Sequence, residues 1–322
     1  DEGYSISGNR IMGRQAAGWS FLNGLIKDRP ERFSAYVKND DQKNLLVNNV
    51  KSILAPDQEM ELNFVNYSEP QNSESNGGIF VPGPGISPFC NQRSYHGHDR
   101  YSLVGITHTT ASLAVMDSLA SLVASDVMPW DAIICTSECV LDTVTKVIDN
   151  RFEKLQSKLS IKNPIYPKFP VIPLGLDKDE FDYSNNFKAE SRKSLGIGID
   201  DIVIVYVGRI SFHAKAHHLP MYLALEQCSQ ELNINQKIHI IQTGWFANDF
   251  TRDVFVNEGK QICPSVEFHF LDGKDQANKH LTLSSGDIFI SLSDNIQETF
   301  GLTPIEGMAA GLAVLVSDWN GY

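Results

Sequence analysis

The sequence predicts an α/β protein with two doubly wound, Rossmann-like domains that each consist of a parallel sheet covered by helices. First, strand-like runs that are almost continuously Val and Ile, such as "DIVIVYV" (201–207), indicate strands buried on both faces. Second, helix-like segments alternate with such runs from residue 101 onward, as in successive βαβ units. The length of 322 residues also suits about two domains.

The first domain is expected to cover residues 1–175. Its predicted elements are, in order, a helix at 15–26, a strand at 101–108, a helix at 112–124, a strand at 131–137 and a closing segment at 169–177. Ser137 is a suitable N-cap for a further helix that begins at Glu138. The first periodic segment is a helix where a doubly wound domain would open on a strand, so the first strand is expected to be missing.

The second domain is expected to cover residues 176–322. Its predicted strands are 201–210, 237–245, 266–270, 286–293 and 312–318, with helical segments between them. A helix is predicted over residues 219–229, and a short one begins near Thr303 and ends before Gly311. The sequence stops directly after the last predicted strand, so this domain is expected to be incomplete at its C-terminal end.

Charge and composition exclude several classes of protein. The net charge of −12 and the pI of about 5.2 argue against a nucleic-acid-binding surface. No run of 18 apolar residues is present, and the polar start does not resemble a signal peptide. The five cysteines are scattered, which fits reduced thiols and a cytoplasmic protein. The oligomeric state and any peripheral membrane contact stay open.

A glycine and two cations follow the strongest strand, in "VGRISFHAK" (207–215). Gly208, Arg209 and Lys215 would lie beyond the carboxyl edge of the sheet, where open α/β folds bind ligands. A guanidinium and an ammonium at that place suit a diphosphate, because they neutralise the charge of a leaving phosphate. The alternative is that both are ordinary solvated loop charges.

A second motif, "SDNIQETFGLTPIEGMAAGLAVLVSD" (293–318), places two carboxylates around a helix N-terminus. The backbone N–H groups from Phe300 to Thr303 would point outward and form an anion site. Glu298 precedes this site, and Glu306 is expected in the first turn of the helix. Because a carboxylate repels phosphate, both glutamates are expected to bind neutral hydroxyl groups.

These motifs resemble those of retaining glycosyltransferases of family 4, which have the GT-B fold. The two glutamates separated by seven residues resemble the donor-site motif of that family, and "VGRISFHAK" resembles its Gly–Arg…Lys segment. "VIPLGLDKDEF" (171–181) resembles the interdomain connector, and "IICTSECV" (133–140) resembles the last strand of the acceptor domain. The resemblance covers residues 101–322, whereas residues 1–100 match only loosely.

The resemblance implies a role for each matching residue. The implied catalytic set is His108, Arg209, Lys215 and Glu298. Arg209 and Lys215 would hold the donor diphosphate, Glu298 the transferred sugar and Glu306 the ribose hydroxyls. The implied donor-binding set adds the backbone of Gly208, Phe300, Gly301 and Leu302 and, from the glycine-containing segment at 7–18, Gly8 and Gly13.

The implied reaction is the transfer of a hexose from a nucleoside diphosphate sugar to a hydroxyl of a glycan, lipid or small molecule, with retention at the anomeric carbon. No metal and no cofactor are expected, because cations and a helix N-terminus stabilise the diphosphate. One alternative is a sugar-nucleotide epimerase of the same fold. Another is a non-catalytic sugar-nucleotide-binding subunit. The donor base, the sugar and the acceptor stay open.

Other groups of polar residues are interpreted as ordinary surface features. The Asp-x-Asp pattern within 177–180 overlaps the connector and is interpreted as a solvated hinge. His96, His98 and Asp99 could contribute zinc ligands, but no further ligand has a suitable spacing, and a loop at the acceptor site is the alternative for them. The adjacent His217 and His218 are interpreted as capping or surface residues on different faces of a helix.

Overall fold

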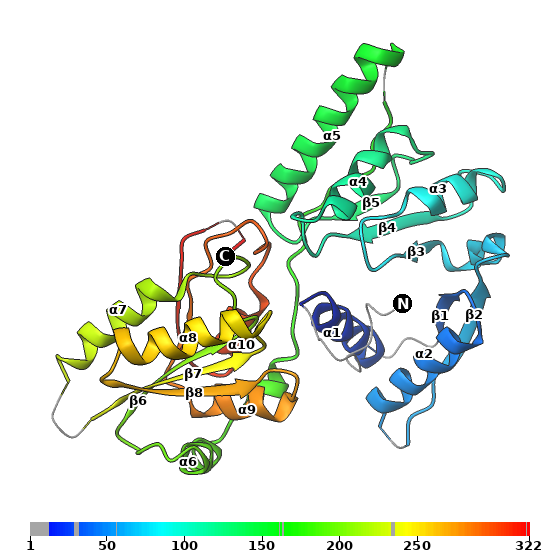
Figure 1. Cartoon of the computed structure of the whole chain (residues 1–322). Coiled ribbons are helices and arrows are strands. Elements are labelled where there is room, and N and C mark those ends of the chain that lie inside the picture. The colour runs from blue at the N-terminus through cyan, green and yellow to red at the C-terminus, as the bar shows by residue number, and fades with distance from the viewer. Residues whose placement is uncertain are drawn as a thin grey trace. The chain divides into compact units, whose positions relative to one another are not determined.

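The computed structural model describes residues 13–28, 32–55, 57–160, 162, 164–232, 236–319 and 321–322. The chain divides into two compact units. Unit 1 comprises Asp1–Gly175 and Gly321, and unit 2 comprises Leu176–Asn320 and Tyr322. The division between Gly175 and Leu176 falls inside the segment that resembles a connector. Figure 1 shows the elements of both units.

Unit 1 contains two separate parallel sheets in its described part. Strands β1 (Arg32–Val37) and β2 (Glu61–Asn66) form one, and β3 (Gly78–Phe80), β4 (Ser102–Ile106) and β5 (Ala132–Ile134) form the other in that order. Its helices are α1 (Gly13–Lys27), α2 (Asp40–Ile53), α3 (Ser87–Ser94), α4 (Leu113–Ser121) and α5 (Glu138–Leu159), with 3₁₀ turns η2 (Pro70–Asn76) and η3 (Leu122–Ala124). The sequence predicted strands only from residue 101 onward, so β1, β2 and β3 are additions to the predicted fold.

Helix α5 begins where its sequence predicts. Ser137 is the N-cap and its side chain accepts a hydrogen bond from the backbone N–H of Val140. The buried residues Val140, Val144 and Ile148 then recur at helical spacing and face the core of unit 1. The same core contains the fully buried ion pair of Arg93 and Asp131, whose nearest atoms lie 2.7 Å apart.

Unit 2 is a doubly wound domain around one five-stranded parallel sheet. The strands β6 (Ile202–Val207), β7 (Ile238–Gly244), β8 (Val266–Asp272), β9 (Ile288–Ser291) and β10 (Ala313–Val316) lie in the order β10-β9-β6-β7-β8. The helices are α6 (Asn185–Ser194), α7 (His218–Ser229), α8 (Asp249–Ile262), α9 (Gln276–Ser285) and α10 (Leu302–Ala309), after the 3₁₀ turn η4 (Lys178–Phe181). The predicted strands and the predicted helix at 219–229 are confirmed.

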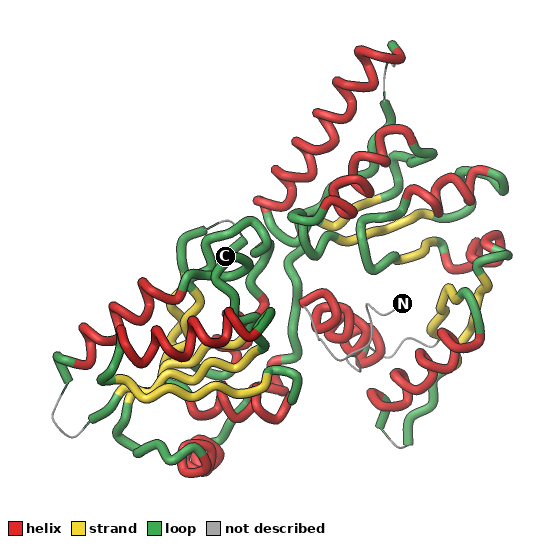
Figure 2. Tube along the Cα trace, viewed as in Figure 1, coloured by secondary structure: helices red, strands yellow, loops and turns green. Residues whose placement is uncertain are grey.

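Helices cover both faces of this sheet, as Figure 2 shows for strands in yellow between helices in red. Side chains of α7 and α8, among them Tyr222 and Phe255, form one core against the sheet. Side chains of α9, η4 and α10, among them Leu283 and Phe181, form a second core on the other face. The continuous Val and Ile runs of β6 and β7 are buried between these two cores, as predicted.

A half-buried carboxylate joins α6 to the sheet of unit 2. Asp287, directly before β9, accepts hydrogen bonds from Lys188 (2.8 Å), from Arg192 (2.7 Å) and from the backbone N–H of Val203 (2.9 Å). Burial acts to raise the pKa of Asp287, but these hydrogen bonds outweigh it and hold the pKa below its usual value. The ionised form of Asp287 therefore stabilises unit 2.

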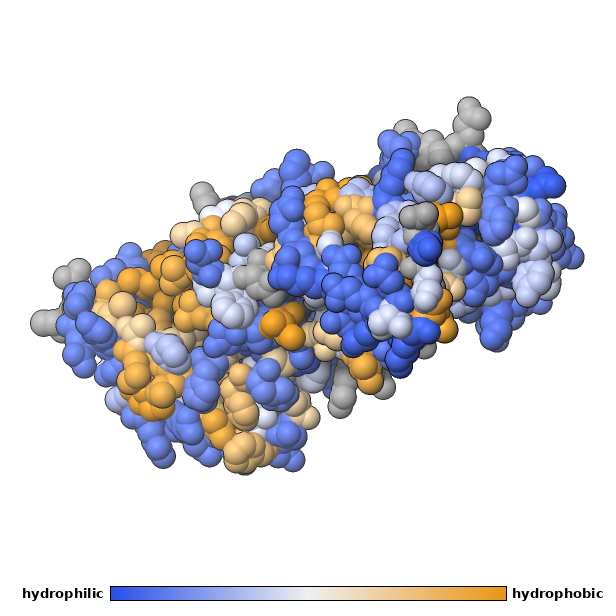
Figure 3. All heavy atoms as spheres, turned by 90° about the horizontal axis from the view of Figure 1, so that it is seen from above, coloured by the Kyte–Doolittle hydropathy of each residue, from blue (hydrophilic) through white to orange (hydrophobic). Residues whose placement is uncertain are grey.

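Apolar side chains also gather on the surface of unit 2, at the left of Figure 3. Exposed examples on α7 and α8 are Leu223 and Phe250, which are 54% and 68% exposed. Within the described residues, none of the helices has both the length and the apolar character that a membrane crossing requires.

Candidate active site

The site residues of unit 2 lie at the topological switch point of its sheet. If β6 is numbered 1, the strand order is 5-4-1-2-3. The order in which strands are added to the sheet therefore reverses between β6 and β9. In open α/β sheets, ligands bind beyond the carboxyl ends of the strands at this point. The segment after β6 carries Arg209 and Lys215, and the segment after β9 carries Glu298. The fold thus places the two sequence motifs side by side.

Arg209 lies against an aromatic ring from the next strand. Its guanidinium is 5.2 Å from the ring centroid of Trp245, directly after β7, which is a cation–π distance. The hydroxyl of Tyr206 donates to the backbone oxygen of Arg209 at 2.8 Å. The Nε atom of Arg209 is buried and has no partner within the described residues. A buried donor of this kind suits an anionic ligand, since an unpaired one is costly.

Three glycines let the strand ends of β6, β7 and β8 approach each other closely. Gly208 has a φ of 148°, which favours glycine, and its N–H donates to Thr243 at 2.9 Å. A Cβ at Gly244 would overlap the carbonyl oxygen of Gly208, and one at Gly273 would lie 2.6 Å from the Cα of Gly244. The backbone at this edge is therefore compact, and Gly208 sets the direction in which Arg209 leaves the sheet.

Lys215 and Glu298 form an ion pair across the switch point. Lys215 Nζ donates to Glu298 Oε2, and the two side chains are 25% and 10% exposed. The hydroxyl of Tyr322 also donates to Glu298 Oε2, at 3.3 Å, and lies 2.6 Å from Ser291 Oγ. The pKa of Tyr322 is raised by burial and by the charge of Glu298, which keeps the hydroxyl protonated as a donor.

The segments after β6 and β9 are also joined through the backbone of Lys215. The Lys215 carbonyl accepts hydrogen bonds from the backbone N–H of Asp294, at 3.3 Å, and from the side-chain amide of Asn295. The backbone N–H of Glu298 in turn donates to the carbonyl of Asn295 at 3.2 Å. Asn295 therefore fixes the cation and the carboxylate relative to each other.

Helix α10 presents its N-terminus beside this ion pair. Gly301 is its N-cap, with φ 82° and ψ 58°, and no side chain hydrogen-bonds to cap the helix. A Cβ at Gly301 would overlap the ring of Tyr322, so the position needs glycine for both reasons. The structure confirms the short helix but not the predicted place of Glu306. The helix begins at Leu302, and the first turn contains no acidic residue.

Glu306 is paired with a residue that the sequence did not single out. Its Oε1 accepts a hydrogen bond from Lys279 Nζ at 2.6 Å, and the two side chains are 6% and 18% exposed. Its Oε2 is buried and has no partner within the described residues. This oxygen is an acceptor that a ligand hydroxyl could satisfy.

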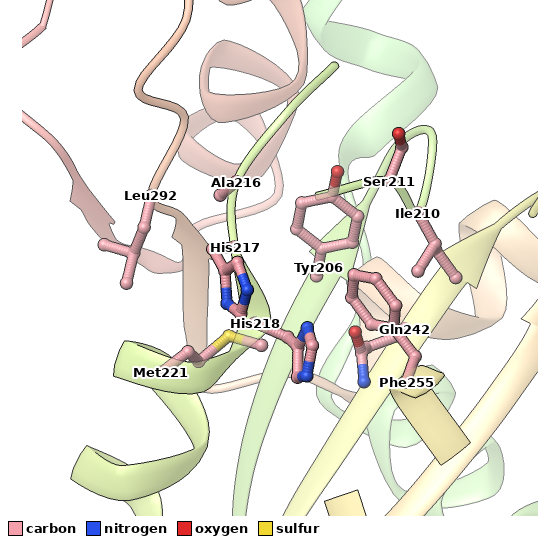
Figure 4. Close-up of a pocket in the computed structure, with 10 residues that line it drawn as sticks. All are labelled: Tyr206, Ile210, Ser211, Ala216, His217, His218, Met221, Gln242, Phe255 and Leu292. Carbon is pink, nitrogen blue, oxygen red and sulfur yellow. The ribbon is translucent and has the colours of Figure 1, made fainter. Parts of the chain in front are cut away.

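A small cavity lies under the segment that carries Arg209 and Lys215 (Figure 4). Tyr206, Ile210, His218 and Gln242 are among its lining residues, and its volume of about 20 Å³ suits a water molecule and not a nucleotide. His218 is buried and 2.6 Å from Glu258, so the prediction of a surface residue was wrong for it. Its ring stacks on that of His217, which caps α7 as predicted.

The remaining predicted site residues lie in the first part of the chain. His108 is in unit 1, in the segment after β4. Gly13 is the first residue of α1, and Gly8 lies outside the described residues. Within the described residues, no three His, Cys, Asp or Glu side chains are grouped as metal ligands would be.

Three contributors to the site had no recognisable signal in the sequence. Lys279 stands in the polar run "GKDQANKH", which is typical of solvated loops. Asn295 and Gly244 act through hydrogen bonding and close approach to residues far along the chain. The only usable hint was that Lys279 and Asn295 follow predicted strands and that Gly244 lies near the end of one.

Part of the chain is similar in sequence to known proteins. Residues 187–322 match the family model described as glycosyl transferases group 1. An uncharacterized glycosyltransferase of Methanocaldococcus jannaschii is 27% identical over 187 residues, which cover 57% of this chain. The matched region spans only 43% of the length of that relative.

Solved glycosyltransferases share the fold of the chain. HepE of Anabaena in complex with UDP has a TM-score of 0.64 at 15% identity, covering 97% of this chain and 80% of that one. A glycosyltransferase of Rickettsia africae has a TM-score of 0.58 at 12% identity, covering 99% and 78%. The chain therefore has the GT-B fold, and its residues 187–322 are similar to glycosyl transferases group 1.

Proposed function

We propose that the protein is a retaining glycosyltransferase of family 4 that transfers a hexose from a nucleoside diphosphate sugar to a hydroxyl acceptor. The observation that carries the proposal is the contact between Lys215 and Glu298 at the switch point. It places a cation suited to a phosphate beside a carboxylate suited to sugar hydroxyls. The UDP bound to HepE supports a UDP-sugar as the first donor to test.

In the proposed reaction, the bond between the anomeric carbon and the diphosphate oxygen breaks while the acceptor oxygen bonds to the same face of that carbon. The proton of the acceptor hydroxyl passes to the leaving phosphate. Arg209, Lys215 and the N-terminus of α10 stabilise the charge that develops on the diphosphate. This arrangement requires no metal ion, which is part of the proposal.

The glutamates serve the neutral parts of the donor in this proposal. Glu298 accepts hydrogen bonds from the transferred sugar, and Glu306 accepts them from the ribose through its buried Oε2. The proposal retains His108 as a catalytic residue, and it keeps Gly8 and Gly13 as residues that approach the donor phosphates. The acceptor is a glycan, a lipid or a small molecule, and the proposed location is cytoplasmic.

The test is a thermal-shift panel of UDP-, GDP- and ADP-sugars, with EDTA present and absent. We expect one nucleotide class to stabilise the protein, and Glu306→Gln to lose most of that shift. The matched control is Glu267→Gln, because Glu267 is ion-paired with Lys237 at 3.0 Å near the amino ends of β7 and β8. No shift with any nucleotide sugar would contradict the proposal.

Product analysis separates the proposed reaction from its alternatives. With the donor that binds, transfer to an acceptor must give a glycoside with the anomeric configuration of the donor. An epimer formed without an acceptor would instead identify an epimerase. Binding without any turnover by the full-length protein would identify a non-catalytic subunit.

A further inference from the structure

The ion pair between Lys279 and Glu306 joins two helices of unit 2 at the carboxyl edge of the sheet. Lys279 lies near the start of α9, which follows β8, and Glu306 lies in α10, which follows β9. The Nζ–Oε1 distance is 2.6 Å, and both side chains are largely buried, at 18% and 6% exposure. Removing one partner of an ion pair buried to this degree leaves an uncompensated charge and is costly.

The two oxygens of Glu306 have different environments. Oε1 accepts from Lys279, whereas Oε2 is buried without a partner within the described residues. Leaving a buried carboxylate oxygen unsatisfied is costly, and a native protein seldom does so without a role for that atom. The lysine therefore occupies one oxygen and leaves the other as the acceptor.

Lys279 is itself held in place from a second direction. Its Nζ lies 5.4 Å from the ring centroid of Phe181 in η4, which is a cation–π distance. The neighbouring His280 is 2.7 Å from the hydroxyl of Tyr183 through its Nδ1 atom. The start of α9 is thus fixed to the segment before α6, and Lys279 has little freedom to leave Glu306.

We propose that Lys279 is a positioning residue for the ribose of the donor nucleotide, and that it makes the site select ribonucleotides over deoxyribonucleotides. This inference rests on the proposed function, in which Glu306 meets the ribose. Lys279 holds the Glu306 carboxylate in an orientation in which Oε2 accepts from a ribose hydroxyl. A hydroxyl that donates to a charged acceptor contributes more to binding than one that donates to a neutral group.

The test compares nucleotides that differ by one ribose hydroxyl. UDP, GDP and ADP are titrated calorimetrically first, and the tightest is then compared with its 2′-deoxy and 3′-deoxy forms. For the wild type we expect at least one deoxy form to bind roughly 10- to 100-fold more weakly, as for a lost hydrogen bond to a charged group. We call this loss of affinity the deoxy penalty, and in Lys279→Met we expect it to fall to about threefold or less.

Matched variants distinguish positioning from a general structural role. Glu306→Gln should reduce the penalty as Lys279→Met does, and the double variant should reduce it no further. Lys237→Met, which removes an ion-paired lysine from the other edge of the sheet, should keep the wild-type penalty. If Lys279→Met does not fold, Lys279→Gln carries the same expectation, since a neutral amide cannot balance the charge of Glu306.

Each outcome decides one question. The inference would be overturned if folded Lys279→Met or Lys279→Gln bound the deoxy forms as weakly, relative to the parent nucleotide, as the wild type does. It would also be overturned if the wild type bound both deoxy forms as tightly as the parent nucleotide. Either result would leave donor binding intact. Failure of UDP, GDP and ADP alike to bind the wild type would overturn the proposed function, and the inference would fall with it.

Discussion

Replacing Lys215 with methionine tests the central contact of the site. Methionine keeps the length and most of the volume of lysine but removes the charge. Lys215 Nζ is hydrogen-bonded to Glu298, whose side chain is only 10% exposed. The substitution therefore affects both the stability of unit 2 and the binding of a diphosphate, and the two effects have different expected sizes.

The expected loss in the free energy of unfolding follows from how little Lys215 and Glu298 are exposed. Without Lys215, Glu298 keeps the hydroxyl of Tyr322 as a donor at 3.3 Å but loses its cation. Leaving a largely buried charged group partly unsatisfied costs about 1–3 kcal/mol in the free energy of unfolding. Adding Glu298→Gln should recover most of that loss, because the two residues contact each other and their effects are not additive.

The functional effect is expected to be larger in turnover than in binding. Donor binding exchanges the contact with Glu298 for a contact with phosphate, so the net change in affinity is at most about tenfold. The charge on the leaving diphosphate grows in the transition state, where a lost stabilising group costs about 10²–10³-fold in rate. We therefore expect kcat to fall far more than KM rises.

The assay measures nucleotide affinity by calorimetry and nucleoside diphosphate release by a coupled enzyme, with the donor identified by the thermal-shift panel. Lys237→Met is the control, since it removes a cation of the same sheet from the ion pair near its amino edge. A wild-type kcat in folded Lys215→Met would refute the assignment of Lys215 to the diphosphate. A fall in kcat for Lys237→Met as well would indicate a general charge effect instead.

Three further substitutions test features described above. Arg93→Leu leaves Asp131 charged and buried, so urea titration should show a loss of about 3–5 kcal/mol; a loss below 1 kcal/mol, roughly that of a surface pair, would contradict this. Gly301→Ala should lower the thermal midpoint, since the φ of 82° costs about 1–2 kcal/mol and the added Cβ overlaps Tyr322; an unchanged midpoint would contradict it. Folding lowers the pKa of Asp287, so Asp287 should stabilise the protein at pH values above its usual pKa of 3.8 and lose this effect as pH falls through the lower folded value. In urea titrations from pH 7 to 3, the free energy of unfolding should therefore fall less on the acid side for Asp287→Asn than for the wild type.

The fold of unit 2 could be predicted because its strands are buried on both faces. A strand such as β6 has almost no alternative to a central position, since each of its residues is apolar or aromatic. The strands β1 and β2 lack this property. Most of their residues are only half-buried, and polar residues stand between the apolar ones, so the sequence gives a weak signal.

The site could be predicted where sequence order fixes geometry. Arg209 follows one strand and Glu298 another, and parallel pairing brings their carboxyl ends to one edge. Lys279 could not be found in this way, because its partner Glu306 is set by how α9 and α10 pack on the sheet. Gly301 was expected near a helix start, but the steric conflict that a Cβ would cause there depends on Tyr322, which follows β10 in the chain.

The hydrogen bonds that Asn295 and Asp294 make to the carbonyl of Lys215 have a consequence for protein engineering. They couple the segment after β6 to the segment after β9, so that replacing one segment alone with a foreign sequence would break these hydrogen bonds. A graft intended to alter donor preference would have to exchange residues 208–217 and 292–301 together. The sheet that carries both segments would not need to be changed.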